Sequence, residues 1–210
     1  YFDMNKSEED LRHDMTDSTR NNINKLSKNP DISIKVFDDN SQFELFKNFH
    51  EQTKKNKGYT DRPAELLLKE LQIQVDNHMC YMIVGYFQDR PISIWQCTVF
   101  GKYMHIYQAG SDTEFREKNI RVTYLLFWES VKLAKQLGLQ ILDLFGGMTP
   151  PNYISKRHPW SGVNSFKESL GGKKMVYMHS RDFAINKPIY FLYYMYSYIR
   201  TSLKGYTVKW

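Results

Sequence analysis

The stretch that decides the fold is MCYMIVGYFQDRPISIWQCTVFGKYMHIYQAG, residues 79–110. It contains three runs rich in β-branched and aromatic residues, and two short turns join them, Asp89-Arg90 and Gly101-Lys102. Runs of this composition that are separated by two turn-forming residues are typical of β-hairpins. The sequence therefore predicts a meander of three antiparallel strands.

Pairing the strands through these turns assigns their side chains to two faces, because direct cross-strand partners share a face of the sheet. The first predicted face is strongly apolar and consists of Met82, Val84, Trp95, Cys97, Val99, Met104 and Ile106. The second carries Tyr81, Gln96, Thr98, His105 and Tyr107. Two interpretations of the second face stay open: it forms the wall of a substrate site, or it is partly wet and partly covered by a helix.

Helical patterns precede and follow the meander. Upstream, the pattern predicts a basic helix between Ser7 and Asn29, a strand at 31–37, a helix opened by a capping box at Ser41, and a helix after Pro63. Downstream, it predicts a helix at 123–138, a buried strand at 139–145, a strand at 173–180 and an aromatic helix after Pro188. No internal repeat interrupts this order.

The order of elements predicts a mixed α/β (α+β) fold, in which a helix crosses from the antiparallel meander to a further, parallel strand. It resembles the order of the GNAT acyltransferase fold. In that fold the loop before the crossing helix carries Arg/Gln-x-x-Gly-x-Gly/Ala, whose backbone N–H groups close on the pyrophosphate of coenzyme A. The matching stretch here, Arg116 to Arg121, lacks both glycines. Coenzyme A is therefore disfavoured as a donor, and a basic surface loop is the alternative interpretation.

Three segments together resemble a known family. They are DLRHDMTDSTRNNINK at 10–25, AGSDTEFREKNIRVTYLLFWESVKLAKQLGLQILDLFGG at 109–147 and GVNSFKESLGG at 162–172. In this succession they are similar to the FemABX peptidyltransferases, which build the cross-bridges of bacterial peptidoglycan. Members of that family have two GNAT-like domains and transfer an amino acid from aminoacyl-tRNA to an amine on the stem peptide of a cell-wall precursor.

The resemblance implies a domain organisation and a set of partners. Residues 31–210 correspond to the second GNAT-like domain, and residues 1–30 to the strand end and basic helix that link the two domains. The implied partners are aminoacyl-tRNA, a muropeptide or lipid-linked precursor, and the N-terminal GNAT-like domain of the same protein. Aminoacyl-tRNA serves as a co-substrate, and no cofactor is expected.

The resemblance also implies site residues. Lys167 stabilises the negative charge that develops when the amine attacks the tRNA ester, and Phe166 excludes water beside it. Arg116, Arg121 and Tyr124 bind phosphates or the muropeptide, and Gly146 and Gly147 let substrate approach the backbone. The chemistry is reasonable in itself, since a cation in a dry pocket stabilises a tetrahedral oxyanion. The alternative is that Lys167 is an exposed helix lysine beside a core phenylalanine.

Asp143, His105 and His158 are further candidate bases, but a structural role is the favoured interpretation of each. The sequence shows neither metal-ligand spacing nor a Gly-x-Ser-x-Gly elbow, so no metal site is expected. Cys80 and Cys97 are read as buried free thiols of a reducing, cytoplasmic protein.

The remaining features concern partners and location. The net charge of +6 suits a polyanionic partner. The tyrosine-rich C-terminal segment either docks on another protein surface, which is the favoured interpretation, or makes a peripheral contact at the inner face of the membrane. The first residues lack the pattern of a signal peptide. Two other functions remain open: N-acylation of an amino sugar or peptide by acyl-CoA in polysaccharide synthesis, and a non-catalytic RNA-binding or scaffold role.

Overall fold

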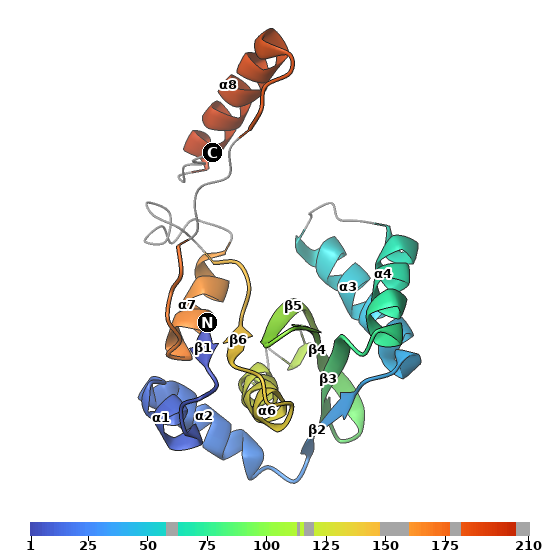
Figure 1. The fold of residues 1–210 in the computed structure, drawn as a ribbon, viewed down its shortest axis with the longest axis vertical. Helices are drawn as coiled ribbons and strands as arrows, with labels where there is room; N and C mark the ends of the chain where they lie inside the picture. The colour runs from blue at the N-terminus through green and yellow to red at the C-terminus, as the bar shows by residue number, and fades with distance from the viewer. Residues whose placement is uncertain (58–62, 113, 116–119, 148–159, 177–181, 205–210) are drawn as a thin grey trace. The chain divides into compact units, whose positions relative to one another are not determined.

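The computed structural model describes residues 1–57, 63–112, 114–115, 120–147, 160–176 and 182–204. The chain divides into two compact units, Tyr1–Phe145 and Gly146–Trp210. The first unit holds the sheet and the helices that cover it, and the second holds two further helices (Figure 1). The predicted domain boundary at residue 30 stays a prediction.

The sheet of the described residues has six strands in the order β1-β6-β5-β4-β3-β2. Their bounds are β1 Phe2–Asp3, β2 Ile32–Phe37, β3 Cys80–Phe87, β4 Arg90–Phe100, β5 Tyr103–Ser111 and β6 Ile141–Asp143. Neighbouring strands are antiparallel except β5 and β6, which are parallel. The predicted mixed α/β fold, with a meander followed by a helix and a parallel strand, is confirmed.

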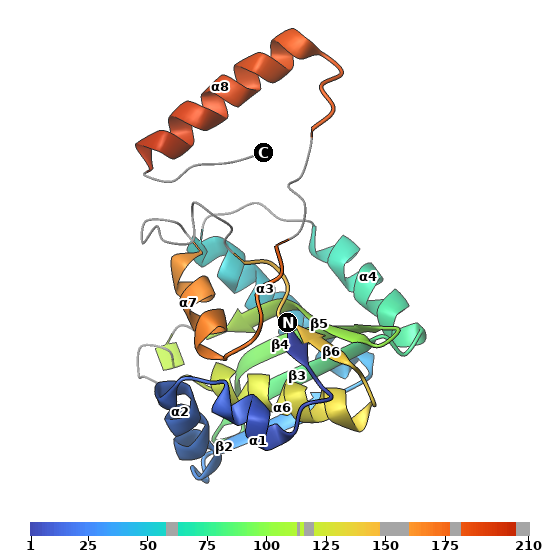
Figure 2. The same cartoon turned by 60° about the vertical axis from the view of Figure 1, so that its left-hand side comes forward.

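Helices cover both faces of this sheet. In the first unit the helices are α1 Glu8–His13, α2 Asp17–Ser27, a 3₁₀ turn η1 Asn40–Gln42, α3 Phe43–Lys57, α4 Ala64–Asp76 and α6 Thr123–Gln136, and the second unit holds α7 Ser161–Ser169 and α8 Lys187–Leu203. Helices α3 and α4 pack on one face, and α6 packs on the other with α2 beside it (Figures 1 and 2). The sheet is therefore the middle layer of three, which explains why its central strands are apolar on both sides.

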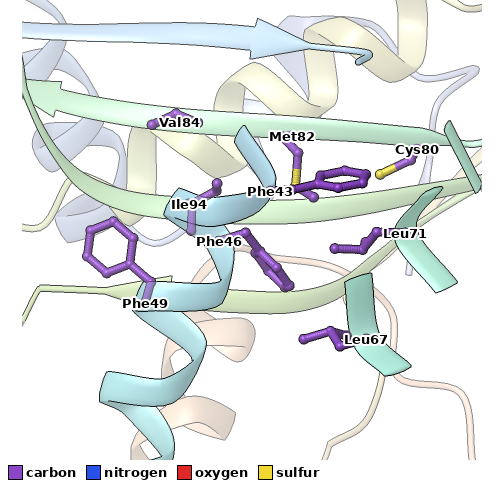
Figure 3. Packing of buried hydrophobic residues seen from close by; sticks show 9 residues of the cluster. All are labelled: Phe43, Phe46, Phe49, Leu67, Leu71, Cys80, Met82, Val84 and Ile94. Carbon is purple, nitrogen blue, oxygen red and sulfur yellow. The ribbon is translucent and has the colours of Figure 1, made fainter. Parts of the chain in front are cut away.

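A cluster of buried side chains fills the layer between α3, α4 and the sheet (Figure 3). It consists of Phe43, Phe46, Phe49, Leu67, Leu71, Cys80, Met82, Val84 and Ile94. The three phenylalanines come from α3 at helical spacing, so one stripe of that helix supplies three of the nine side chains. On the sheet side, the cluster consists of residues of β3 and β4, so this layer holds α3 and α4 against those strands.

The register of the β3–β4 hairpin differs from the prediction. The turn is formed by Gln88 and Asp89, whose φ angles are 48° and 63°, and not by Asp89 and Arg90. A β-bulge between Gly85 and Tyr86 then moves the pairing back by one residue, so that Met82 lies opposite Gln96 and not opposite the predicted Cys97. Because side chains alternate along a strand, one extra residue exchanges the faces.

The predicted assignment of faces is therefore wrong for β3. Tyr81 lies opposite Cys97, and Met82 shares its face with Gln96 and Thr98. The prediction of one apolar and one mixed face also fails, because Met82 and Ile83 point to opposite faces and are both fully buried. Across β4 and β5, the predicted partners Cys97 and Ile106 are confirmed.

Three predicted elements differ in extent. The helix expected between Ser7 and Asn29 is two helices, because Thr16 adopts an extended conformation and caps α2 by accepting the Thr19 N–H. The parallel strand covers 141–143 instead of 139–145. Of the strand expected at 173–180, residues 173–176 have no regular structure and 177–180 lie outside the described residues.

Both cysteines are buried and free, as predicted. They cannot bridge easily, because Cys80 shares its face with Thr98 whereas Cys97 shares the opposite face with Tyr81. Burial raises the pKa of the Cys80 thiol to about 12, and it raises the pKa of Cys97 as well.

These thiols should be inert in the folded protein, because only the thiolate reacts and burial disfavours it. We expect a chromogenic disulfide reagent at pH 8 to titrate neither cysteine in the native chain and both after unfolding in denaturant. Rapid native labelling of either thiol would contradict the packing described above.

Candidate functional site

The parallel strands β5 and β6 separate after a short ladder. Their pairing runs from Tyr103 opposite Ile141 to His105 opposite Asp143, whereas β5 continues to Ser111. The far half of β5 thus has no β6 partner on that edge. A strand edge with free backbone N–H and C=O groups can bind an extended ligand. We refer to this opening, from His105 and Asp143 to Ser111, as the strand fork.

A histidine and an aspartate lie at the root of the strand fork. The Nδ1 atom of His105 is 3.5 Å from Oδ2 of Asp143. The other carboxylate oxygen, Oδ1, accepts the backbone N–H of Phe145 at 2.9 Å, and Phe145 has a φ of 55°. Asp143 therefore holds a tight turn after β6, which agrees with the structural role favoured from the sequence. Sequence reasoning found no partner for His105, because strand pairing alone brings it to Asp143.

Helix α4 covers part of the polar surface on this side of the sheet. Gln74 Oε1 accepts hydrogen bonds from Gln96 Nε2 and from Thr98 Oγ1, both at 2.9 Å. Of the two interpretations of the mixed face, helix coverage is confirmed for Gln96 and Thr98. Tyr81 lies on the opposite face, and Tyr107 occupies a bulge in β5.

In the second unit, α7 carries the predicted lysine. Lys167 is half-buried, and its Nζ donates a hydrogen bond to the backbone oxygen of Gly146 at 2.5 Å. The neighbouring cation, Lys174, pairs instead with Glu168, and this hydrogen bond lowers the pKa of the Glu168 carboxyl. The structure thus brings together two predicted site residues, Lys167 and Gly146, and the ammonium group of Lys167 is bonded to the Gly146 carbonyl.

The turn that contains the two predicted glycines is closely packed. A Cβ atom on Gly146 would lie 3.3 Å from the ring of Trp160, and one on Gly147 would lie 3.6 Å from the side-chain oxygen of Asn164. Asn164 is itself buried and donates to Glu168 Oε1 at 2.8 Å. Glycine at position 146 lets the chain pass close to Trp160.

The other predicted site residues belong to different elements. Phe166 is half-buried on α7, Arg121 is exposed just before α6, and Tyr124 is buried in the first turn of α6. Arg116 lies outside the described residues. Their roles in substrate binding stay predictions. Among the described side chains, no group of three histidines, cysteines or carboxylates is placed to hold a metal ion.

Comparison with known proteins assigns the fold. A family model described as an acetyltransferase (GNAT) domain matches residues 14–153. The chain belongs to the GNAT acetyltransferase family. Acyl transfer is accordingly its reaction class, and the fork between β5 and β6 lies within the matched residues. No curated protein sequence matches the chain.

Several solved structures are similar in fold to this chain. FemX is 14% identical, with a TM-score of 0.64 over 90% of this chain and 62% of FemX. A possible acetyltransferase from Clostridium difficile 630 is 16% identical, with a TM-score of 0.54 over 72% of this chain and 97% of its own. The aminoglycoside N-acetyltransferase AAC(6')-Iy, in complex with CoA, is 9% identical, with a TM-score of 0.52 over 72% of this chain and 94% of its own. At such identities these likenesses show the fold, and this chain spans less than two thirds of FemX.

Proposed function

We propose that this GNAT domain belongs to a FemABX-like aminoacyltransferase, which transfers an amino acid from aminoacyl-tRNA to an amine of a peptidoglycan precursor. The observation that carries the proposal is the extent of the likeness to FemX, 90% of the chain. Ninety per cent of the chain is more than the whole segment from residue 1 to residue 153, where the GNAT match ends. The likeness to FemX therefore extends into the C-terminal part of the chain, in which Lys167 lies. The two acetyltransferases, with lower TM-scores of 0.54 and 0.52, each cover 72% of the chain.

The state of Lys167 supports the same proposal. In aminolysis of an ester, the amine nitrogen bonds to the carbonyl carbon, and charge collects on the carbonyl oxygen before the ribose hydroxyl leaves. An ammonium group that is half-buried and held by a backbone carbonyl stabilises this charge more strongly than one in water. Gly146 thereby orients Lys167, and the half-buried Phe166 beside it would limit the access of water.

The proposed partners follow from charge and from length. A net charge of +6 favours a tRNA, and Arg116 and Arg121 are suited to its phosphates. Because the chain spans 62% of FemX, we propose that an N-terminal GNAT-like domain completes the site for a muropeptide or lipid-linked precursor. None of the described helices is long and apolar enough to cross a membrane. The exposed aromatic side chains of α8 would dock on that domain or lie against a membrane surface.

The second candidate is an acyl-CoA-dependent N-acyltransferase acting on an amino sugar or peptide. The solved structures favour it, since AAC(6')-Iy was crystallised with CoA and a similar predicted acetyltransferase from Clostridium acetobutylicum with acetyl-CoA. The missing glycines at 119 and 121 argue against it. Arg121 places a side chain where the backbone would have to approach a pyrophosphate.

The two donors can be compared directly. We expect the intact protein to transfer label from bulk tRNA charged with radioactive amino acids to a stem peptide with a free amine, and to release no thiol from acetyl-CoA. The readouts are labelled peptide after chromatography and thiol release. Thiol release without peptide labelling would replace the first proposal by the second. Inactivity with both donors, together with retained tRNA binding, would favour the RNA-binding or scaffold role.

A further inference from the structure

A group of polar side chains lies on the α3/α4 side of the sheet beside the strand fork. It consists of Gln96 and Thr98 of β4, His105 and Gln108 of β5, and Asp143 of β6. Direct pairing places Gln96 opposite Gln108, Thr98 opposite His105, and His105 beside Asp143. Because paired residues share a face, all five point to the same side.

A β-bulge in β5 makes this grouping possible. The register shifts between Gln96, which pairs with Gln108, and Cys97, which pairs with Ile106, so Tyr107 is the extra residue of β5. Without the extra residue, His105 and Gln108 would point to opposite faces, since they are an odd number of positions apart. Bulges often occur beside active sites, where they redirect a side chain. The bulge turns a second polar side chain toward the root of the fork.

Several of these polar atoms are buried without a hydrogen-bond partner among the described residues. They are Gln96 Oε1, His105 Nδ1 and Gln108 Oε1. Buried polar atoms are nearly always satisfied, so a cluster of unsatisfied ones on neighbouring strands indicates a place for water or ligand. The surface at the root of the fork is therefore polar and incompletely satisfied within the described chain.

His105 itself is arranged as the acceptor of a proton. Its Nδ1 is buried and faces Asp143 at 3.5 Å, whereas a third of the side chain is exposed. Tyr103 stacks on the imidazole with the ring planes 8° apart, which limits its rotation. The second oxygen of Asp143 is held by the Phe145 N–H. A carboxylate facing Nδ1 favours the tautomer with the proton on Nδ1 and a free lone pair on Nε2.

We propose that His105 is the catalytic base of the acyl transfer and that Asp143 is the residue that positions it. This proposal depends on the proposed function in one respect, namely that an acyl group is transferred to an amine. It applies whether the donor is aminoacyl-tRNA or acyl-CoA. The amine nitrogen bonds to the acyl carbon and passes one proton to Nε2 of His105. The carbon–oxygen bond of the tRNA ester then breaks, and the imidazolium returns that proton to the leaving hydroxyl. The 3.5 Å separation shortens when the imidazole becomes charged beside the carboxylate.

Substitutions in the intact protein test this role. His105→Ala should lower kcat by about 10²–10⁴ with little change in KM, and added imidazole should restore part of the rate. Asp143→Asn keeps the oxygen that accepts the Phe145 N–H but loses the charge, so it should lower kcat by at least about tenfold without imidazole rescue. The matched control is His13→Ala on exposed α1, which should change neither kcat nor the response to imidazole. A thermal melt confirms that each variant is folded.

A measurement that needs no activity accompanies these assays. Nitrogen NMR of the intact protein should show neutral His105 with its proton on Nδ1, and Asp143→Asn should shift the proton toward Nε2. A wild-type imidazole protonated on Nε2 overturns the proposal, as does a folded His105→Ala variant with wild-type kcat or without imidazole rescue. If the wild-type protein transfers from neither donor, the proposed function is refuted instead. The NMR measurement of the His105 tautomer would then still test whether Asp143 pairs with His105.

Discussion

Replacing Lys167 by methionine is expected to lower kcat of the transfer by about 10²–10³ while leaving KM nearly unchanged. The methionine keeps the length and apolar stem of the side chain and removes the charge. Since the charge of the carbonyl oxygen exists only near the transition state, its loss affects kcat and not ground-state binding. The hydrogen bond to Gly146 is lost as well, which costs about 1 kcal/mol of stability.

Single-turnover transfer from labelled aminoacyl-tRNA measures this effect. The matched control is Lys174→Met, because Lys174 lies in the same unit but pairs with Glu168. It should retain activity within about threefold, as expected for an exposed ion pair. If the folded Lys167→Met variant transfers at the wild-type rate, Lys167 has no part in the chemistry and is an ordinary helix lysine.

Replacing Phe46 by alanine is expected to lower the free energy of unfolding by about 3–5 kcal/mol. Phe46 is 1% exposed and lies in the middle of the cluster that joins α3 and α4 to the sheet (Figure 3). Truncation removes the transfer free energy of the ring and leaves a cavity that the surrounding layer fills only in part. A loss of this size is a large fraction of the stability of an ordinary domain.

Denaturant unfolding followed by tryptophan fluorescence gives the change in free energy. The control is Leu66→Ala on α4, since Leu66 is 52% exposed, and its effect should stay within about 0.5 kcal/mol. A change below about 1 kcal/mol for Phe46→Ala would mean that α3 does not pack on the sheet as described. The comparison also shows whether the layer between α3, α4 and the sheet is stable enough for the activity assays.

The candidate site was predicted only in part. A family resemblance pointed to Lys167 and Gly146, and the structure adds that one bonds to the other. The pair of His105 and Asp143 was missed, because no local motif joins two residues that are distant in the chain. A histidine on a polar strand face, followed later by an aspartate inside an apolar strand, is the available signal. It becomes informative only when both strands are assigned to neighbouring places in the sheet.

The order and type of most elements were determined by the sequence itself, and the strand expected at 173–180 is the exception, since residues 173–176 have no regular structure. Strand composition, capping residues and apolar periodicity act between near neighbours, so a linear pattern reports them directly. The tertiary structure decided which faces the side chains share. Two bulges, at Gly85/Tyr86 and at Gln96/Cys97, each add a residue to one strand and reverse the alternation beyond it. Whether a strand takes such an extra residue depends on what packs against both of its faces, and this information is absent from the strand's own sequence.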